Sequence, residues 1–308
     1  MNPEARMALR LVKRSGRLVR VEGDKGWLKG RAGFSTAWRR IGVFVDLVSD
    51  PRTPDGAWEA DLGDWAARPG TILAFCSNHE STILVPDRGF FFSDGYRGDR
   101  EAGSMAPPFM ERDAAIVWRG APSGQGEPFA DRLDAADPRL RQRVRMCLML
   151  ANHAEAAERK VDVGIARSRG LDPGLAARYE QAGLLRDPVS ERSWCGRRYA
   201  IDIDGHANAF SNLFRRLLYG CCVIKVASPL GFRQWYYDRL VPWTHYVPVQ
   251  ADLTDLRDAI EWVHDRPSDA ERIAAEGRRL AASMDLEAER ARVIARLQEV
   301  GSAGGAGG

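Results

Sequence analysis

The period of the apolar positions changes near residue 120. Before that point the apolar runs are short and rich in β-branched residues, so the sequence predicts strands at 41–47, 71–76 and 114–118. Turn-rich stretches such as SDPRTPDGAW and SDGYRGDREAG separate these runs. The first 120 residues are therefore predicted to form short strands joined by loops, and residues 120–126 (GAPSGQG) a loop that leads into a helical region.

From residue 138 the pattern becomes helical. Leu140, Val144, Cys147, Leu148 and Ala151 recur at three and four positions, which predicts a helix with one buried face. A second helix is expected to begin near Asp172-Pro173. A third has apolar residues on one face between 210 and 218 and stops at Gly220. Buried strands are predicted between the helices at 199–203, 221–226 (CCVIKV) and 245–249 (HYVPV).

The C-terminal residues are also predicted to be helical. Ser268-Asp269-Ala270-Glu271 has the spacing of a capping box, and a last amphipathic helix is expected at 285–300. Residues 301–308 (GSAGGAGG) are predicted to be a flexible tail. Because strands alternate with helices in the C-terminal half, we expect a mostly parallel sheet that is covered on both faces.

Composition narrows the class of protein. The chain has 308 residues, 44% hydrophobic and 28% charged, which suits a folded protein of two domains. No apolar run approaches the roughly 18 residues of a membrane-spanning helix, and the first residues lack the apolar core of a signal peptide. We therefore expect a cytoplasmic protein. The five cysteines are odd in number and include no CxxC pair, so most are predicted to be core residues.

The net charge of +3 is unevenly distributed. Residues 1–40 contain eleven Lys or Arg and only three acidic residues. Such a basic end suits peripheral contact with anionic lipid of the inner membrane, or a phosphate-bearing acceptor. A solvated face is the alternative. No recognition motif accompanies the charge, so a nucleic-acid partner is not expected.

Residues 197–226 are the most informative unit for chemistry. They read as strand, glycine, helix and strand, and Gly205 allows the backbone to turn sharply and approach a ligand. The amide groups of a helix that begins near residue 207 would suit a diphosphate. Asp202-Ile203-Asp204 is similar to a DxD metal motif, but only Asp204 lies at the strand end. A structural carboxylate is therefore favoured over a metal ligand, and neither a metal nor a cofactor is expected. Walker A, HExxH and GxSxG motifs are absent from the sequence.

Three segments resemble glycosyltransferase family 90. They are YAIDIDGHANAFSNLFRRLLYGCCVIK, FRQWYYDRLVPWTHYVPV and the helical stretch that begins at DLTDLRDAIEWVHD. Val117-Trp118-Arg119-Gly120 is similar to the aromatic-Arg-Gly element of the family, and the resemblance covers roughly residues 70–285. It implies an α/β protein of the GT-B-like class, with two Rossmann-like domains and the nucleotide-sugar site in the C-terminal one. The expected divisions are 1–116 on the acceptor side, 117–285 for the nucleotide-sugar, a helix at 286–300 and a tail at 301–308.

The resemblance also implies site residues. Arg119 is expected to grip the diphosphate because a guanidinium binds phosphate oxygens bidentately, with a surface ion pair as the alternative. The remaining residues expected near the nucleotide-sugar are Gly120, Gly205, His206, Ser211, Asn212, Arg215, Arg216, His245 and Tyr246. A structural role for His206 and core packing for Tyr246 are the alternatives.

The chain departs from the family at two positions. Thr82 stands where eukaryotic members carry the Asp that acts as base, and threonine does not accept protons near neutral pH. Glu80, two residues earlier, is therefore the predicted base; His79 and Asp87 are also near, and a base from elsewhere in the chain, or none, is the alternative. Leu213 replaces an Arg that follows the helix serine, so Arg215 or Arg216 is expected to substitute for it.

These features predict an inverting, metal-independent glycosyltransferase. It would move a sugar from a UDP-sugar to a hydroxyl of a bacterial surface glycan, either lipopolysaccharide or capsule. Two alternatives stay open. One is a degenerate, non-catalytic family member that binds sugar-nucleotide or glycan. The other is a magnesium-dependent sugar phosphotransferase that uses Asp202 and Asp204.

Overall fold

The structure, a computed structural model, describes residues 8–23, 34–66, 69–129, 133–151, 161–167 and 171–304. The chain folds into two compact units. Unit 1 contains residues 1–96, 230–238 and 284–308, and unit 2 contains residues 97–229 and 239–283. The chain therefore passes between the units four times.

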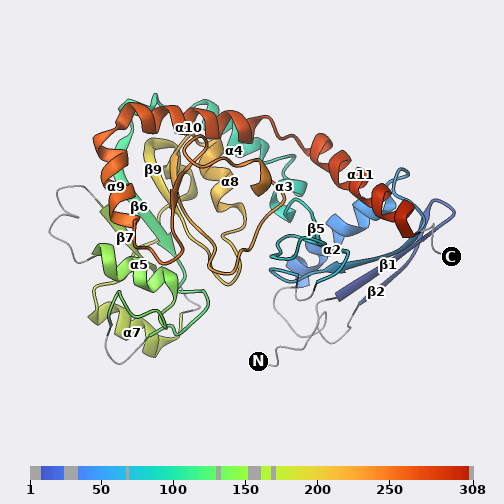
Figure 1. Cartoon of the computed structure of the whole chain (residues 1–308), viewed down its shortest axis with the longest axis horizontal. Coiled ribbons are helices and arrows are strands. Elements are labelled where there is room, and N and C mark those ends of the chain that lie inside the picture. The colour runs from blue at the N-terminus through green and yellow to red at the C-terminus, as the bar shows by residue number, and fades with distance from the viewer. Residues whose placement is uncertain are drawn as a thin grey trace. The chain divides into compact units, whose positions relative to one another are not determined.

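Unit 2 is built on a parallel sheet of six strands in the order β11-β10-β9-β6-β7-β8 (Figure 1). All of these neighbouring strands pair in parallel, as the alternation of strands and helices predicted. The strands are β6 (Asp113–Gly120), β7 (Val161–Ala166), β8 (Leu185–Arg186), β9 (Arg197–Asp202), β10 (Cys222–Val226) and β11 (Val247–Val249).

The strand order reverses between β6 and β9. The chain moves outward through β6, β7 and β8, returns to the other side of β6 as β9, and continues through β10 to β11. This is the arrangement of a Rossmann sheet, in which ligands bind beyond the carboxyl ends of the strands at the point of reversal. The fold therefore directs attention to the loops that follow β6 and β9.

Helices cover both faces of this sheet. Trp118, Ile201 and Ile224 share one core with Val144 of α5 and Val263 of α9. Asp202 and Lys225 alternate to the opposite face, which α8 covers. The helical elements of unit 2 are α4 (Arg97–Ser104), η1 (Phe109–Glu111), α5 (Gln142–Ala151), α7 (Pro173–Gln181), η2 (Glu191–Gly196), α8 (Ser211–Leu218), α9 (Leu256–Asp265) and α10 (Pro267–Ala282).

Residues 97–116 lie with unit 2, which differs from a division after residue 116. The guanidinium of Arg112 donates to the carbonyl oxygens of Tyr219 and Gly220, both at 2.8 Å. Asp99 of α4 forms an ion pair with Arg215 of α8 at 2.8 Å. A boundary at residue 116 would separate these bonded partners.

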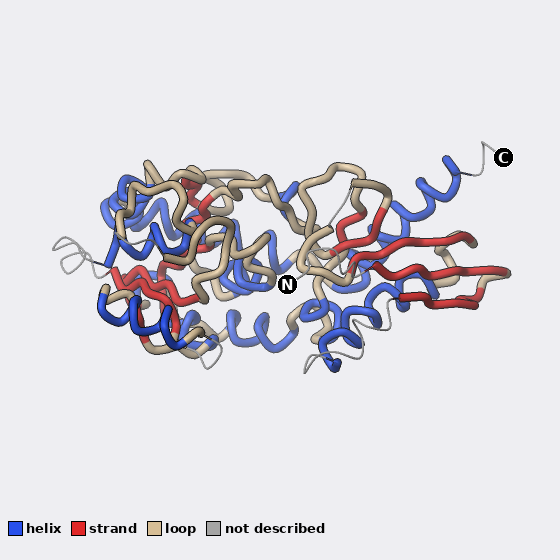
Figure 2. The backbone as a smooth tube through the Cα atoms, turned by 90° about the horizontal axis from the view of Figure 1, so that it is seen from below, coloured by secondary structure: helices blue, strands red, loops and turns tan. Residues whose placement is uncertain are grey.

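Unit 1 contains a mixed sheet in the order β2-β1-β3-β4-β5. β1 (Ala8–Arg14) pairs antiparallel with β2 (Arg17–Gly23) and β3 (Gly56–Asp61), whereas β4 (Ile72–Ala74) and β5 (Ile83–Leu84) continue in parallel. Figure 2 shows these strands in red. The helices of unit 1 are α2 (Phe34–Ser49), α3 (Arg88–Phe92) and α11 (Leu286–Gly304), and the short η3 (Tyr237–Arg239) ends the inserted segment 230–238.

The strand predicted at 41–47 is wrong, because these residues lie inside α2. Ile41, Phe44, Leu47 and Val48 are all buried, and their spacing of three and four positions places them on one helix face. The β-branched content of IGVFVDL misled the prediction. Burial of this face against the rest of unit 1 outweighs local strand propensity.

The C-terminal predictions are partly corrected. The capping box at Ser268 does not form, since α10 begins at Pro267 and no side chain caps it. α11 extends to Gly304, so residues 301–304 are helical rather than a flexible tail, and 305–308 lie outside the described residues. Gly301 lies against Pro54, whose ring atoms would be 3.0 Å from a Cβ at that position.

The basic N-terminal stretch is only partly a surface feature. Lys13 is 1% exposed, and its Nζ donates to the carbonyl oxygens of Asp50 (2.5 Å) and Thr53 (2.6 Å). Arg14, Arg17 and Arg20 are exposed on the β1–β2 hairpin. None of the helices in the described ranges combines the length and apolarity that crossing a membrane requires.

Candidate functional site

Arg143 of α5 joins the two loops at the point where the strand order reverses. Its guanidinium donates to the carbonyl oxygens of Ile203 (2.9 Å) and Asp204 (2.9 Å), which follow β9. It also donates to the carbonyl oxygen of Ala121 (3.2 Å) and to Ser123 Oγ (2.9 Å), which follow β6. The position of each loop is thus fixed relative to the other by one half-buried guanidinium.

Burial lowers the pKa of the Arg143 guanidinium, while the carboxylates of Asp202 and Asp204 raise it. The guanidinium carbon lies 5.6 Å from the ring centre of Trp118. An arginine keeps its charge even when its pKa is lowered, so a permanent positive charge lies directly behind the two loops.

Glycines allow the backbone of these loops to approach closely. A Cβ on Gly205 would lie 2.8 Å from Ser123 Oγ and 3.2 Å from an Nη of Arg143. A side chain at this position would therefore displace Ser123 and Arg143, whose hydrogen bonds hold the two loops together. A Cβ on Gly120 would lie 2.5 Å from the ring of Trp118. Gly205 and Gly120, both predicted from the sequence, therefore have a steric reason to be glycine.

A buried ion pair lies beside this point on the face covered by α8. Lys225 Nζ lies 3.2 Å from Asp202 Oδ2, and Asn212 Nδ2 donates to Asp202 Oδ1 at 3.1 Å. The Asp202 side chain is completely buried. Lys225 is therefore part of the interior rather than a solvated charge at the end of a strand, and Asp202 fixes the start of α8.

Asp204 is a titratable group in the loop that follows β9. Its side chain is 3% exposed, and burial raises the pKa of its carboxyl to about 6. The positive charge of Lys225 and a hydrogen bond from Ser228 lower that pKa, although less than burial raises it. A carboxyl with a pKa near 6 changes its charge close to physiological pH.

The start of α8 carries two of the predicted residues, Ser211 and Asn212. No side chain caps this helix, and its N-cap residue, Phe210, has a positive φ of 50°. The Phe210 amide is bound instead by Asn208 Oδ1 at 2.9 Å. His206 is exposed on the preceding loop, and its carbonyl oxygen accepts a hydrogen bond from Gln125 at 3.3 Å.

The Arg119 side chain is bound to Asp162 of β7 rather than to the loops after β6 and β9. Its Nη2 contacts both carboxylate oxygens of Asp162, at 2.7 and 2.8 Å. Its Nη1 donates to the carbonyl oxygens of Trp118 and Asp162, and its Nε donates to that of Asp187. A role for Arg119 in binding a diphosphate stays a prediction, and it requires the guanidinium to leave Asp162.

Arg215 and Arg216 lie one turn beyond Asn212 on α8, and both are held in ion pairs. Arg215 pairs with Asp99 (2.8 Å) and Glu191 (3.5 Å). Arg216 is 4% exposed, pairs with Glu191, and stacks 4.0 Å from the ring centre of Trp194. The structure therefore does not bring these two residues together with Gly205 and Asn212.

His245 and Tyr246 precede β11, so they lie where that strand begins rather than where it ends. Nδ1 of His245 accepts the amide of Val241 at 2.9 Å, and burial lowers the histidine pKa. Burial raises the pKa of the Tyr246 hydroxyl. The contacts of His245 are those of a structural histidine.

Residues 77–82, in unit 1, contain the predicted base. Glu80 lies in an exposed turn, whereas Thr82 is buried with its Oγ1 2.9 Å from Ser77 Oγ. Arg233 of the inserted segment pairs with Ser77 through two backbone hydrogen bonds of 2.9 and 3.1 Å. Asp87 is fully committed as the cap of α3, where it accepts from two amides and from the Tyr96 hydroxyl.

Arg143 and Ser123 were missed by sequence reasoning. The signal available was an arginine on the first helix after β6, but many helices carry surface arginines at this spacing. Within the described ranges, no group of three or more His, Cys, Asp or Glu side chains is placed to hold a metal ion.

The sequence profile of glycosyl transferase family 90 matches residues 68–291. The chain is 31% identical to protein O-glucosyltransferase 3 of Homo sapiens over 256 residues, which cover 78% of this chain and 45% of that protein. It is 33% identical to protein O-glucosyltransferase 2 of Danio rerio over 259 residues, covering 78% and 46%. An uncharacterized protein, 027R of Frog virus 3 (isolate Goorha), is 31% identical over 197 residues, covering 58% and 19%. The chain thus spans less than half the length of each of these relatives.

A glycosyltransferase from Rickettsia africae ESF-5 has a partly similar backbone. The TM-score is 0.45 at 10% identity, covering 75% of this chain and 63% of that one. A likeness at that level does not define the fold of this chain.

Proposed function

The chain belongs to glycosyltransferase family 90, and on that premise we propose that it transfers a sugar from a UDP-sugar to an acceptor hydroxyl with inversion. Unit 2, whose sheet has the Rossmann order, would bind the donor, and unit 1 would bind the acceptor; unit 1 has a mixed sheet rather than the second Rossmann-like sheet that the sequence predicted. The observation that carries the proposal is the pair of loops after β6 and β9, which Arg143 holds together at the reversal of a Rossmann strand order.

The donor diphosphate would lie against Gly120 and Gly205 and the uncapped start of α8. Glycine at both positions lets the two loops pack closely on Trp118, Ser123 and Arg143, and the Ser211 amide begins a helix whose dipole favours negative charge. Arg143 adds positive charge behind the loops. These features would stabilise the UDP that leaves when the anomeric bond breaks.

The acceptor hydroxyl needs a base, and we propose Glu80 for this role. As its carboxylate takes the proton, the acceptor oxygen attacks the anomeric carbon, and the bond to the diphosphate breaks with its electron pair remaining on UDP. The exposed turn at Glu80 is held in place by the pairing of Ser77 with Arg233, which supports a fixed position for the carboxylate.

The donor site is tested by calorimetric binding of UDP and UDP-glucose, with and without EDTA. We expect binding that EDTA does not change and that Gly205→Ala weakens by at least about tenfold, since the new Cβ would displace Ser123 and Arg143. Gly98→Ala is the matched control, because nothing lies within 4 Å of a Cβ there. If wild-type protein binds no uridine nucleotide, the donor assignment is wrong.

The non-catalytic alternative has one observation in its favour. Thr82, at the expected base position, is buried and hydrogen-bonded to Ser77, so it is not available for proton transfer. Full transferase activity in Glu80→Gln would exclude Glu80 as the base. A wild-type protein that binds UDP-glucose but transfers glucose to no acceptor would favour the non-catalytic reading. The magnesium-dependent phosphotransferase would be favoured instead by activity that vanishes in EDTA.

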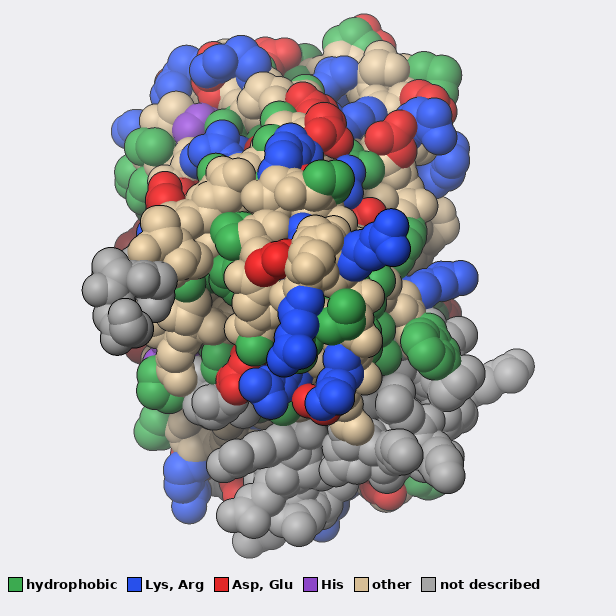
Figure 3. Space-filling model, turned by 90° about the vertical axis from the view of Figure 1, so that its right-hand side faces the viewer, with side chains coloured by type: hydrophobic (Ala, Val, Ile, Leu, Met, Phe, Trp, Pro, Cys, Tyr) green, Lys and Arg blue, Asp and Glu red, His purple; other side chains and the backbone are tan. Residues whose placement is uncertain are grey.

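We further propose a bacterial surface glycan, lipopolysaccharide or capsule, as the acceptor, and a cytoplasmic location at the inner face of the inner membrane. Exposed Arg14, Arg17 and Arg20 on the β1–β2 hairpin, beside Val19 (57% exposed) and Val21 (44% exposed), suit an anionic lipid surface. Figure 3 shows the Lys and Arg side chains on this face. Charge reversal, Arg14→Glu with Arg17→Glu, should abolish binding to phosphatidylglycerol vesicles, and unchanged binding would refute the idea.

A further inference from the structure

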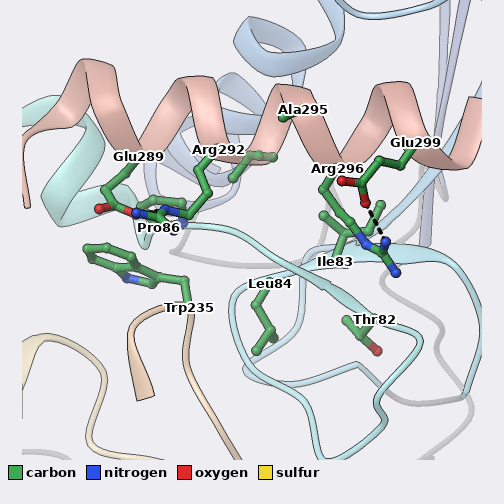
Figure 4. Close-up of a pocket in the computed structure, with 11 residues that line it drawn as sticks. Thr82, Ile83, Leu84, Pro86, Trp235, Glu289, Arg292, Ala295, Arg296 and Glu299 are labelled. Carbon is green, nitrogen blue, oxygen red and sulfur yellow. Dashed lines mark hydrogen bonds and ion pairs between the residues drawn. The ribbon is translucent and has the colours of Figure 1, made fainter. Parts of the chain in front are cut away.

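Unit 1 contains a groove of ≈ 320 Å³ that none of the steps above uses. One wall is a face of α11, and the other is formed by residues 82–86 together with Trp235 of the inserted segment (Figure 4). The volume lies at the lower end of the range of about 300–1,000 Å³ that is usual for small-molecule sites. It suits one or two sugar rings rather than a long chain.

Charged side chains on α11 line the groove as acid–base pairs. Nε of Arg292 lies 3.4 Å from Glu289, and Nη1 of Arg296 lies 2.6 Å from Glu299. Glu289 is almost completely buried, whereas the other three side chains are more than half exposed. Two carboxylates and two guanidinium groups cancel in charge, so the groove offers donors and acceptors without favouring an anion.

Apolar side chains form the rest of the lining. Ile83 and Val293 are buried, and Pro86 lies close to Trp235 (Figure 4). The Trp235 ring is braced by Phe90, whose ring centre is 4.7 Å away, and by Tyr236 at 5.1 Å. This edge of the groove is therefore rigid and aromatic.

We propose that this groove binds a neutral saccharide unit of the acceptor, an inference that rests on the proposed glycosyltransferase function. A sugar ring has apolar C–H faces and a rim of hydroxyls, which match an aromatic and aliphatic surface beside paired carboxylates and guanidinium groups. A phosphate or uronate would gain little net attraction because the charges of the lining cancel, and an acyl chain would offer no hydrogen-bonding group to the four charged side chains. The neutral sugar is the ligand that satisfies both kinds of lining.

The groove also adjoins the turn that carries the proposed base. Thr82 lines the groove, and Glu80 is two residues earlier in the same turn. A saccharide held here would extend from the turn along α11. The groove is thus a subsite for a sugar next to the accepting unit, and it would contribute to acceptor affinity rather than to donor binding.

The test is saccharide binding, measured by ligand-observed NMR and calorimetry with maltotriose, cellotriose, chitotriose and trigalacturonate. We expect at least one neutral trisaccharide to bind. Ala295→Trp, which fills the exposed rim, should weaken binding by about tenfold or more. Arg296→Ala should weaken it about tenfold, the lower end of the contribution of one hydrogen bond to a charged group. Arg279→Ala removes an equivalent exposed pair with Glu276 on α10 and should have no effect.

UDP-glucose binding by the same variants separates this inference from the proposed function. Both groove variants should bind UDP-glucose with an unchanged affinity, which also shows that they are folded. The groove assignment is overturned if no neutral trisaccharide binds, if trigalacturonate binds best, or if Ala295→Trp leaves saccharide binding intact. Failure of the wild-type protein to bind UDP-glucose would count against the donor site and leave the groove result standing.

Discussion

Replacing Arg143 with alanine tests whether the two loops are held together by one guanidinium group. The substitution removes hydrogen bonds to four acceptors, namely the carbonyl oxygens of Ala121, Ile203 and Asp204 and the hydroxyl of Ser123. Buried acceptors that lose their donor cost roughly 1–3 kcal/mol each, but water that enters the site will satisfy some of them. We expect the free energy of unfolding to fall by about 2–4 kcal/mol, because Arg143 is half-buried and four acceptors lose their donor together.

Arg141→Ala is the matched control on the same helix. Arg141 donates to the carbonyl oxygens of Pro122 (2.7 Å) and Gly126 (3.1 Å), so it contacts the loop after β6 without reaching the loop after β9. Because it makes two hydrogen bonds and both go to one loop, its loss should lower the free energy of unfolding by only about 1 kcal/mol. The loss of unfolding free energy in Arg143→Lys should lie between those of the two alanine variants, since one ammonium group cannot span both loops as a planar guanidinium does.

Urea denaturation followed by circular dichroism gives the stabilities, and calorimetry gives the affinity for UDP-glucose. Affinity should fall with Arg143→Ala and recover partly with Arg143→Lys. Two results would refute this reasoning. One is that Arg143→Ala lowers the free energy of unfolding no more than Arg141→Ala does, and the other is that Arg143→Ala binds UDP-glucose as tightly as wild type.

Three further predictions concern the same unit. Asp204→Asn should raise the free energy of unfolding by up to about 3 kcal/mol above pH 6. The Asp204 carboxyl has a folded pKa of about 6 and an ordinary pKa of 3.8, so its ionised form destabilises the folded protein above pH 6 and this cost disappears as the pH falls. A gain in stability that persists unchanged at about pH 3.5 would contradict this. Lys225→Met should cost about 3–5 kcal/mol by leaving the Asp202 carboxylate buried without its cation, and adding Asp202→Asn should restore part of that loss in urea titrations. Gly103→Ala should cost about 1–3 kcal/mol in thermal unfolding, since its Cβ would lie 2.2 Å from the Leu218 carbonyl oxygen, whereas Gly98→Ala on the same helix should not destabilise.

Local patterns predicted much of unit 2. The β9–α8–β10 unit and the start of α7, where Asp172 caps the helix and Pro173 follows, depend on residues that are close in sequence. The pairing of Lys225 with Asp202 could not be predicted in the same way, because it depends on β10 lying next to β9 in register. The hydrogen bonds by which Arg143 joins the loops after β6 and β9 likewise depend on the order of strands from distant parts of the chain.

Unit 1 was harder to predict for a related reason. Its sheet is completed by the hairpin β1–β2, and its core by α2 and α11, so each local segment is ambiguous until its partners are known. Lys13 shows the limit most clearly: its charge suggested a surface residue, yet its ammonium is enclosed by carbonyl oxygens of residues 50 and 53. Tertiary contacts decided the environment of this residue, and composition could not.

The return of α11 to unit 1 has a consequence for the order in which the chain folds during synthesis. Arg290 of α11 forms ion pairs with Asp46 (2.9 Å) and Asp50 (3.2 Å), and Gln298 donates to the carbonyl oxygen of Arg52. Residues 8–96 therefore leave the ribosome long before the helix that completes their core, whereas unit 2 has all of its strands by residue 249. Until α11 is synthesised, residues 8–96 expose apolar surface that α11 later covers, and such surface favours chaperone binding or aggregation.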